Sequence, residues 1–499
     1  MSSVADIYRT SLTLLTDLYQ LTMAQAYWAS GTAGKEAVFH LFFRENPFEG
    51  GFSVACGLAR VMECLDRFRF EPQDLDYLTS LEGNDGRPLL APAFLRELED
   101  LELTCDVDAV PEGTVVFPHE PLVRVRGPIL QGQLLETVLL NVINFETLIA
   151  TKAARVSLAA RGDTVIDFGL RRAQGIDGGI SASRAAYVGG CAGTSNVLAG
   201  RLYGIPVRGT HAHSWVMSFD SELEAFEAYA RAQPNNCVLL VDTYDTLEGV
   251  RHAVEVGRRL RERGHELAGI RLDSGDLAFL SIEARKVLDA GGFPQAVIVA
   301  SNDLDERVIA SLKEQGAAIT VWGVGTRLVT GGDQPALGGV YKLGAVRPPG
   351  EPWQHRVKVS EQSIKTTNPG VQQVRRYETD QGFLADVIYD EEQGLPAEPV
   401  VVDPLDPTRR KPIAAGTRGT DLLEPILRGG RLVYDPPPLP AVRARAAEQV
   451  GRLHLGITRF VNPHQFPVGL SAELHELKTR LILEAREETS DRPHFNRGA

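Results

Sequence analysis

Apolar residues recur at helical spacing near the start of the chain. Leu14, Leu18 and Leu21 lie on one helical face between residues 10 and 30, with Ser or Thr ahead as a cap and Gly31 behind as a stop. The run 36–43 (EAVFHLFF) predicts a strand. Residues 105–127 predict three short strands, separated by Pro-Glu-Gly and Pro-His-Glu-Pro turns. We therefore expect an N-terminal α/β domain over residues 1–131.

The pattern changes at about residue 132. A long helical run over 132–160 is followed by short apolar runs that alternate with amphipathic segments, which indicates repeated βα units. The predicted strands are 164–167, 207–209, 237–242, 269–272, 296–300, 319–322 and 339–343. This number of strands favours an irregular βα barrel over an open sheet, and we assign the barrel to residues 132–365.

The remaining segment, 366–499, has less regular patterning. Prolines concentrate in 396–412 and 435–440, where they exclude interior strands and helices. The stretch 471–486 alternates charge with leucine and predicts a peripheral helix. We expect a C-terminal extension that completes the N-terminal domain and adds proline-rich linkers and peripheral helices. The predicted fold class is α/β.

Composition and charge narrow the choice of partners and compartment. The chain has 499 residues, of which 43% are hydrophobic and 23% charged, as in globular proteins with more than one structural unit. A net charge of -13 argues against nucleic-acid binding. The first ten residues lack a secretory signal and no long apolar run predicts a membrane span. Five scattered cysteines without a C-x-x-C pair suggest a reducing, cytoplasmic location.

Polar residues follow nearly every predicted strand of the middle segment. They occur in DFGLRR (167–172), GTHAHS (209–214), Asp242, DSGD (273–276), SND (301–303) and GVGT (323–326). In a βα barrel the carboxyl ends of the strands meet at one mouth, which is where catalytic residues lie. We therefore expect these loops to share one site.

Two of these loops carry charged or phosphate-binding groups. Arg271 and Asp273 alternate along a strand end and face the same way, which places a cation and an anion in one pocket or makes a structural ion pair. Asp276 is a candidate helix cap. Glycines at 323 and 325 with Thr326 can bring backbone N–H groups to a phosphate, although a G-x-G alone is equally typical of an ordinary loop.

The residues alone leave the role of two histidines open. His211 and His213 lie in a polar loop and are equal candidates for titration, phosphorylation or a structural role. They do not predict a metal site, because no third ligand stands at diagnostic spacing. Tyr19, an aromatic residue on the first helix, is typical of a core position.

Several long motifs, in order, resemble those of nicotinate phosphoribosyltransferases over nearly the whole chain. They are LLTDLYQLTMAQAYW (14–28), FHLFFRENPFEGGFSVACGL (39–58), DFGLRRAQGIDGG (167–179), GTHAHS (209–214), RLDSGDL (271–277), ASND (300–303) and WGVGTRLVT (322–330). The run RFVNPHQFPVGLS (459–471) resembles the longer-chain branch of this family. The chain lacks the C-terminal cysteine cluster of some relatives, so a structural zinc is not expected.

The resemblance implies a type II phosphoribosyltransferase that joins nicotinate to phosphoribosyl pyrophosphate with Mg²⁺ and with ATP as co-substrate. It implies a homodimer in which Tyr19 of the neighbouring chain stacks on the base. His213 would accept phosphate from ATP, Arg271 would act in catalysis, and Asp273 would lie beside the ribose and the metal. The implied substrate-binding positions are Tyr19, Phe168, Arg171, Thr210, Ser214, Arg271, Asn302, Gly323, Gly325 and Thr326.

Three other functions compete with this one. A nicotinamide phosphoribosyltransferase would take a neutral base, although the motif DFGLRRAQG favours nicotinate. A non-catalytic sensor could keep a phosphate-binding barrel, but the polar residues of the mouth are intact. A barrel aldolase or isomerase would need a lysine at a strand end for a Schiff base, and we find none.

Overall fold

The computed structural model describes residues 12–490. The first ten residues and the predicted helix start at residue 10 therefore lie outside the described residues. Residues 12–17 form turns, and the first described helix, α2, begins later than predicted and spans Leu18–Ala29.

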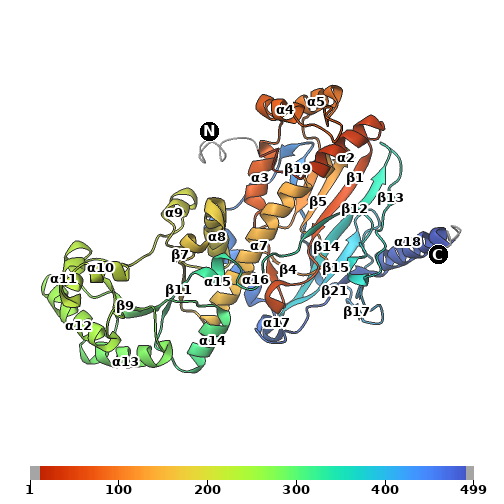
Figure 1. Ribbon diagram of the computed structural model, residues 1–499. Helices are drawn as coiled ribbons and strands as arrows, with labels where there is room; N and C mark the ends of the chain where they lie inside the picture. The colour runs from red at the N-terminus through yellow and green to blue at the C-terminus, as the bar shows by residue number, and fades with distance from the viewer. Residues whose placement is uncertain (1–11, 491–499) are drawn as a thin grey trace, which may run out of the picture.

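A seven-stranded antiparallel sheet organises the N-terminal part (Figure 1). The strands, in sheet order, are β13 (Gln354–His355), β12 (Val340–Arg347), β1 (Glu36–Phe42), β5 (Val123–Pro128), β3 (Asp106–Ala109), β19 (Glu424–Arg428) and β20 (Arg431–Leu432). A separate pair joins β2 (Ser53–Val54) to β4 (Val115–Val116). The strands predicted over 36–43 and 105–127 are confirmed. The prediction that 339–343 belongs to the barrel is wrong, because β12 pairs with β1 over its whole length.

A second sheet of six parallel strands forms the middle segment. In sheet order these are β7 (Gly193–Thr194), β6 (Thr164–Asp167), β11 (Val321–Val324), β10 (Val297–Ala300), β9 (Gly269–Leu272) and β8 (Val238–Leu240). The strand β7 was not predicted. The expected strand at 207–209 is reduced to a single parallel bridge between Thr194 and Val207.

The order of the parallel strands is that of a βα barrel with one interruption. Within the described residues no strand ladder joins β7 to β8, so hydrogen bonding between strands does not close the expected barrel. The loop 207–211 lies in the gap: Val207 bridges to β7, and the side chain of His211 accepts a hydrogen bond from the backbone N–H of Leu240 in β8. The mixed α/β fold class is confirmed.

The C-terminal part is more regular than predicted. It forms a six-stranded mixed sheet in the order β17 (Arg410–Pro412), β16 (Val400–Val402), β21 (Val468–Ser471), β15 (Gly382–Asp390), β14 (Gln372–Thr379) and β18 (Arg418–Asp421). The proline-rich stretch 396–412 supplies β16 and β17. The expectation that this stretch holds no interior strand is wrong, because β16 lies between β17 and β21. The predicted terminal helix is confirmed as α18 (Ala472–Ser490).

Helices cover the parallel sheet in the left lobe of Figure 1 and connect it to the other sheets. The other α-helices are α3 (Leu58–Asp66), α4 (Pro72–Thr79), α5 (Pro92–Glu99), α6 (Ile129–Leu134), α7 (Glu136–Ala159), α8 (Gly175–Val188), α9 (Val197–Tyr203), α10 (His213–Met217), α11 (Glu222–Ala232), α12 (Thr246–Glu262), α13 (Leu277–Ala290), α14 (Glu306–Glu314), α15 (Thr326–Val329), α16 (Leu439–Gly451) and α17 (Leu455–Thr458). Short 3-10 turns occur at Pro47–Glu49, Leu170–Arg172 and Ser363–Lys365. No helix within residues 12–490 has both the length and the apolar composition needed to cross a bilayer.

Helix α7 joins the two main hydrophobic cores. Leu139 and Ile143, in its first half, pack in the core of the antiparallel sheet, whereas Ile149 and Val156, in its second half, pack in the core of the parallel sheet. Burying apolar side chains on both halves stabilises the helix in one position. The parallel sheet is therefore held at a fixed place against the rest of the molecule.

Candidate active site

Arg271, near the carboxyl end of β9, bonds to three loops of the predicted mouth. Its Nη1 donates to Thr210 Oγ1 at 3.1 Å, its Nε to Ser301 Oγ at 2.8 Å and its Nη2 to Asp273 Oδ1 at 2.8 Å. The guanidinium is mostly buried and lies 5.6 Å from the ring centre of Phe168, a cation–π distance. Arg271 thus contacts the loops that follow β6, β9 and β10, and also the loop 207–211 in the gap between β7 and β8.

Two carboxylates belong to the same cluster: Asp273 pairs with Arg271, and Asp242 is joined to it through the backbone of Asp273. Asp242 follows β8, and its buried Oδ2 accepts hydrogen bonds from the backbone N–H of Asp273 at 2.8 Å and from Ser274 Oγ at 2.7 Å. Burial acts to raise the pKa of Asp273, but the Ser301 hydroxyl and the Arg271 guanidinium outweigh it and leave this pKa below its ordinary value. Asp273 is therefore ionised at neutral pH and fixed in orientation.

His213 begins α10 and faces both carboxylates. Its Nδ1 lies 3.1 Å from Thr243 Oγ1, and its Nε2 lies 3.8 Å from Asp273 Oδ2 and 4.0 Å from Asp242 Oδ1. Its side chain is 38% exposed, so a ligand can reach the imidazole. This histidine thus combines access with the proximity of two carboxylates.

His211 occupies a different environment. It is buried, and its Nε2 accepts from the Leu240 N–H at 3.2 Å, which requires that nitrogen to be unprotonated. Burial, with the nearby charge of Arg271, lowers its pKa to about 4. His211 thus links the loop in the gap of the parallel sheet to β8. The structure therefore distinguishes the buried His211 from the accessible His213, which the residues alone could not do.

The 323–326 loop contacts Phe168, whose ring lies against Arg271. A methyl group added at Gly323 would lie 2.6 Å from the Phe168 ring, so only glycine leaves room for that ring. The Phe168 N–H donates to the Val324 carbonyl at 2.8 Å. Gly323 is buried in β11, so the backbone N–H groups open to a phosphate are those at Gly325 and in the first turn of α15, which begins at Thr326.

The remaining predicted positions lie at the edge of this mouth or away from it. Arg171 and Asn302 on mouth loops and Ser214 in the first turn of α10 are exposed, and within residues 12–490 their side chains make no hydrogen bond or ion pair. Asn302 has a φ of 92°, an unusual backbone angle for a residue other than glycine. The expectation from the residue pattern that Tyr19 is a core position is wrong, because its side chain is 47% exposed. It lies on α2, in the other lobe of Figure 1, so it does not belong to this chain's own mouth.

Three residues that hold the site together were given no role by sequence reasoning, although Asp242 and Ser301 were among the polar residues expected at the mouth. Asp242, Thr243 and Ser301 all stand at strand ends, and each makes a direct hydrogen bond to Asp273 or His213. The position of Asp242 after a buried strand was visible in the sequence. Its side-chain partners were not, because they depend on neighbouring strands.

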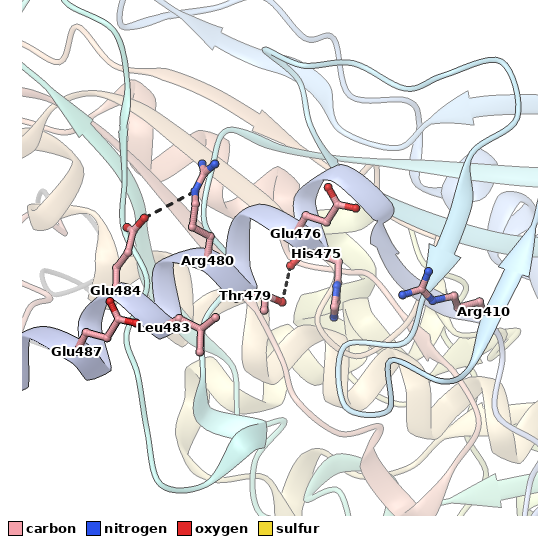
Figure 2. Close-up of a pocket in the computed structure, with 8 residues that line it drawn as sticks. All are labelled: Arg410, His475, Glu476, Thr479, Arg480, Leu483, Glu484 and Glu487. Atoms are coloured by element: carbon pink, nitrogen blue, oxygen red, sulfur yellow. Dashed lines mark hydrogen bonds and ion pairs between the residues drawn. The ribbon is translucent and has the colours of Figure 1, made fainter. Parts of the chain in front are cut away.

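A hollow of about 550 Å³ lies elsewhere, on α18 (Figure 2). Its lining mixes cations and anions: Arg410, His475, Glu476, Thr479, Arg480, Leu483, Glu484 and Glu487. The 3.8 Å contact between Arg480 and Glu484 joins two side chains one helical turn apart. None of the mouth residues lines this hollow, so the volume of a cavity does not by itself identify the active site.

A second cluster of possible metal ligands is already neutralised. Cys56, Glu112 and Glu146 are buried close together, but the Arg184 guanidinium bonds to Glu112 at 2.7 Å and to Glu146 at 3.0 Å. The arginine supplies the positive charge that a metal would otherwise supply. We therefore assign this cluster to structure.

Comparison with known proteins agrees with the geometry. The chain matches the nicotinate phosphoribosyltransferase N-terminal domain over residues 14–144, the nicotinate phosphoribosyltransferase family over 164–376 and the corresponding C-terminal domain over 372–478. It is 41% identical to the nicotinate phosphoribosyltransferase of Bacillus subtilis, covering 96% of this chain and 98% of that one. It is 44% identical to nicotinate phosphoribosyltransferase pncB2 of Mycobacterium tuberculosis, covering 92% and 98%.

The solved structures give the same result. The crystal structure of human nicotinic acid phosphoribosyltransferase superimposes with a TM-score of 0.81 at 34% identity, covering 93% of this chain and 99% of that chain. The nicotinate-nucleotide pyrophosphorylase of Pyrococcus furiosus shares the fold, with a TM-score of 0.68 at 22% identity, covering 91% and 99%. On its sequence, its fold and the residues around Arg271, the chain belongs to the nicotinate phosphoribosyltransferase family.

Proposed function

We propose that the chain forms nicotinate mononucleotide and pyrophosphate from nicotinate and phosphoribosyl pyrophosphate, in NAD salvage, and couples this reaction to ATP hydrolysis. The observation that carries the proposal is the mouth in which Arg271 is fixed between Thr210 and Asp273, with Phe168 against it. A cation beside an aromatic ring suits a base that is both flat and negatively charged. Relatives named for this reaction cover nearly the whole chain.

The transfer needs electrostatic stabilisation rather than a general base. The pyridine nitrogen of nicotinate has a free lone pair that attacks the anomeric carbon of the ribose, while the bond from that carbon to the pyrophosphate oxygen breaks. Positive charge grows on the ribose ring, and an ionised, oriented Asp273 is placed to stabilise it. The backbone N–H groups at Gly325 and Thr326 are available for a phosphate.

The carboxylates of the mouth also suit Mg²⁺. Asp273 carries exposed carboxylate oxygen, and the Oδ1 atom of Asp242 is buried without a hydrogen-bond partner among the residues that the structure describes. Hard oxygen donors of this kind are the ligands that Mg²⁺ prefers. When bound, Mg²⁺ would supply positive charge to the departing pyrophosphate. We assign Asp273 as its main protein ligand.

We assign the coupling to phosphorylation of His213. One imidazole nitrogen attacks the γ-phosphorus of ATP, the bond to the bridging oxygen breaks, ADP leaves, and the other nitrogen keeps its proton. Water later cleaves the phosphorus–nitrogen bond and releases phosphate. The new charge of roughly -1.5 to -2 would lie within reach of Arg271 and Mg²⁺ and so change substrate affinity. The exposure of His213, set against the buried, bonded His211, supports this choice.

We further propose a homodimer in which α2 of the neighbouring chain completes the mouth. Leu15, Leu18, Tyr19 and Met23 expose apolar surface on and before α2, and Ile176, Val197 and Leu202 do so near the mouth. Apolar patches of this kind are typical of association surfaces. We place the enzyme in the cytoplasm, in keeping with five cysteines that form no disulfide.

The test of the coupling compares the wild-type chain with His213→Ala. Nicotinate mononucleotide formation is measured with and without ATP, together with ADP release. We expect the variant to lose ATP stimulation and to keep a slow ATP-independent reaction. His454, an exposed histidine on α17 that caps its own helix, provides the matched control as His454→Ala. ATP stimulation that survives in His213→Ala would contradict the phosphohistidine step.

A further inference from the structure

Two exposed aromatic residues follow the mouth strands β8 and β9, and within the described residues their rings have no aromatic partner. Within residues 12–490, four tyrosine or phenylalanine side chains are largely exposed: Tyr19, Tyr77, Tyr244 and Phe279. Tyr244 is 68% exposed and Phe279 is 56% exposed. Neither ring packs on another described ring, and the Tyr244 hydroxyl makes no hydrogen bond within the described chain. Large aromatic surfaces in water are typical of binding sites, because their burial by a ligand is favourable.

The loops that carry these rings are fastened together at their base. Asp242 Oδ2 accepts hydrogen bonds from the Asp273 N–H and from Ser274 Oγ, which ties the β8–α12 loop to the β9–α13 loop. Tyr244 comes two residues after Asp242. Phe279 lies in the first turn of α13, where its N–H donates to the capping Asp276 Oδ1 at 3.1 Å. Both rings therefore project from backbone that is held in place.

The backbone that carries these rings belongs to loops that contact His213. Thr243, the residue before Tyr244, bonds to His213 Nδ1 at 3.1 Å, and Asp273 lies 3.8 Å from His213 Nε2. Arg271 and Phe168 occupy the inner part of the mouth, where the pyridine base is proposed to bind. The exposed rim is thus a separate surface, adjacent to the histidine that receives the phosphate.

We propose that Tyr244 and Phe279 form the binding surface for the purine base of the nucleoside triphosphate that phosphorylates His213. The inference rests on the proposed function, since it needs a phosphate donor at His213. A purine has two apolar faces that stack on aromatic rings, and its triphosphate chain would run from the rim to the imidazole. Stacking recognises the faces of the base and does not require hydrogen bonds to its edge.

The test uses the full-length enzyme and measures ADP release against ATP concentration, with nicotinate and phosphoribosyl pyrophosphate present. Tyr244→Leu and Phe279→Leu each remove a ring. We expect each to raise the KM for ATP on the order of tenfold, as loss of one stacking partner does, with a much smaller change in the KM for nicotinate. Tyr244→Phe keeps the ring and should keep the wild-type KM for ATP. Tyr77→Leu removes an exposed ring on α4, distant from the mouth, and serves as the matched control.

Three outcomes would overturn the inference. An unchanged KM for ATP in both leucine variants would show that the rings do not bind the base. A changed association state of the variants in light scattering would show that the rings cover a second copy of the chain. Absence of ATP hydrolysis in the wild-type enzyme would instead contradict the proposed ATP coupling. The proposed purine-binding surface would then fail as well, because it depends on that coupling.

Discussion

Arg271 uses most of its hydrogen-bonding capacity within the protein. Its contacts to Thr210, Ser301 and Asp273 fix the guanidinium before any substrate arrives. Preorganised charge of this kind lowers an activation barrier because it needs no reorganisation during the reaction. At the scale of single residues, catalysis therefore depends on charges that the fold has already placed.

Asp273→Asn should reduce kcat on the order of 10²- to 10³-fold, by analogy with the loss of one preorganised electrostatic group. Asparagine keeps the shape but removes the negative charge that we propose stabilises the ribose in the transition state. Asp276→Asn is the matched control, because Asp276 is exposed and asparagine caps a helix about as well as aspartate. A kcat of Asp273→Asn near that of the control would mean that its carboxylate is structural.

Much of the candidate site could be predicted from single residues. Arg271 and Asp273 were expected to face one pocket, and they form a 2.8 Å ion pair there. Their partners Asp242 and Ser301 could not be predicted, because those contacts cross between neighbouring strands. The spacing of the histidines could not separate His211 from His213, since the difference lies in which ring meets the Leu240 N–H.

At the scale of elements, local pattern identified strands better than it identified their partners. The buried apolar runs correctly predicted the first and last residues of β6 and β9. Residues 340–347 also formed a strand, but β12 joined the sheet of β1, roughly three hundred residues away in the chain, because both strands bury one face in the same core. The two-residue strand β7 was too short to give any pattern.

His211 makes the gap between β7 and β8 sensitive to acid. Its pKa in the folded chain is about 4, below the ordinary value of 6.5, so the unfolded chain binds the proton more readily. The free energy of unfolding is thus highest above pH 6.5 and falls as the pH drops towards 4. The loss from this one group should reach at most about 3 kcal/mol.

The check is the Tm of thermal unfolding between pH 7 and pH 4, for the wild-type chain and for His211→Gln. Glutamine can still accept from the Leu240 N–H but does not titrate. We expect the Tm of the variant to fall less steeply with acid than that of the wild type. Parallel curves for the two proteins would exclude His211 as the acid-sensitive group.

At the scale of the whole molecule, the two parts of the proposed shared site lie in different lobes of one chain. Asp273 lies in the mouth of the parallel sheet, whereas the exposed Tyr19 lies on α2 in the other lobe (Figure 1). A symmetric pair of chains can bring α2 of one copy to the mouth of the other. The exposed apolar residues on both surfaces fit this arrangement.

Mixed dimers of Tyr19→Ala and Asp273→Asn chains test the arrangement. Each variant alone should be weak at low nicotinate concentration. In the mixed dimer one mouth receives both changes and the other receives neither, so purified heterodimers should recover about half of the wild-type activity. If Tyr19 serves its own chain, both mouths stay defective and no activity returns.

The central claim is that the loops joined at Arg271 bind nicotinate and catalyse its transfer to phosphoribose. The most direct measurement is kcat/KM for pyrophosphate release from phosphoribosyl pyrophosphate, with nicotinate or with nicotinamide as the base. We predict a clear preference for nicotinate, with nicotinate mononucleotide as the product, because Arg271 places a cation where the carboxylate of the base can reach it. A preference for nicotinamide, or no pyrophosphate release with either base, would contradict the account.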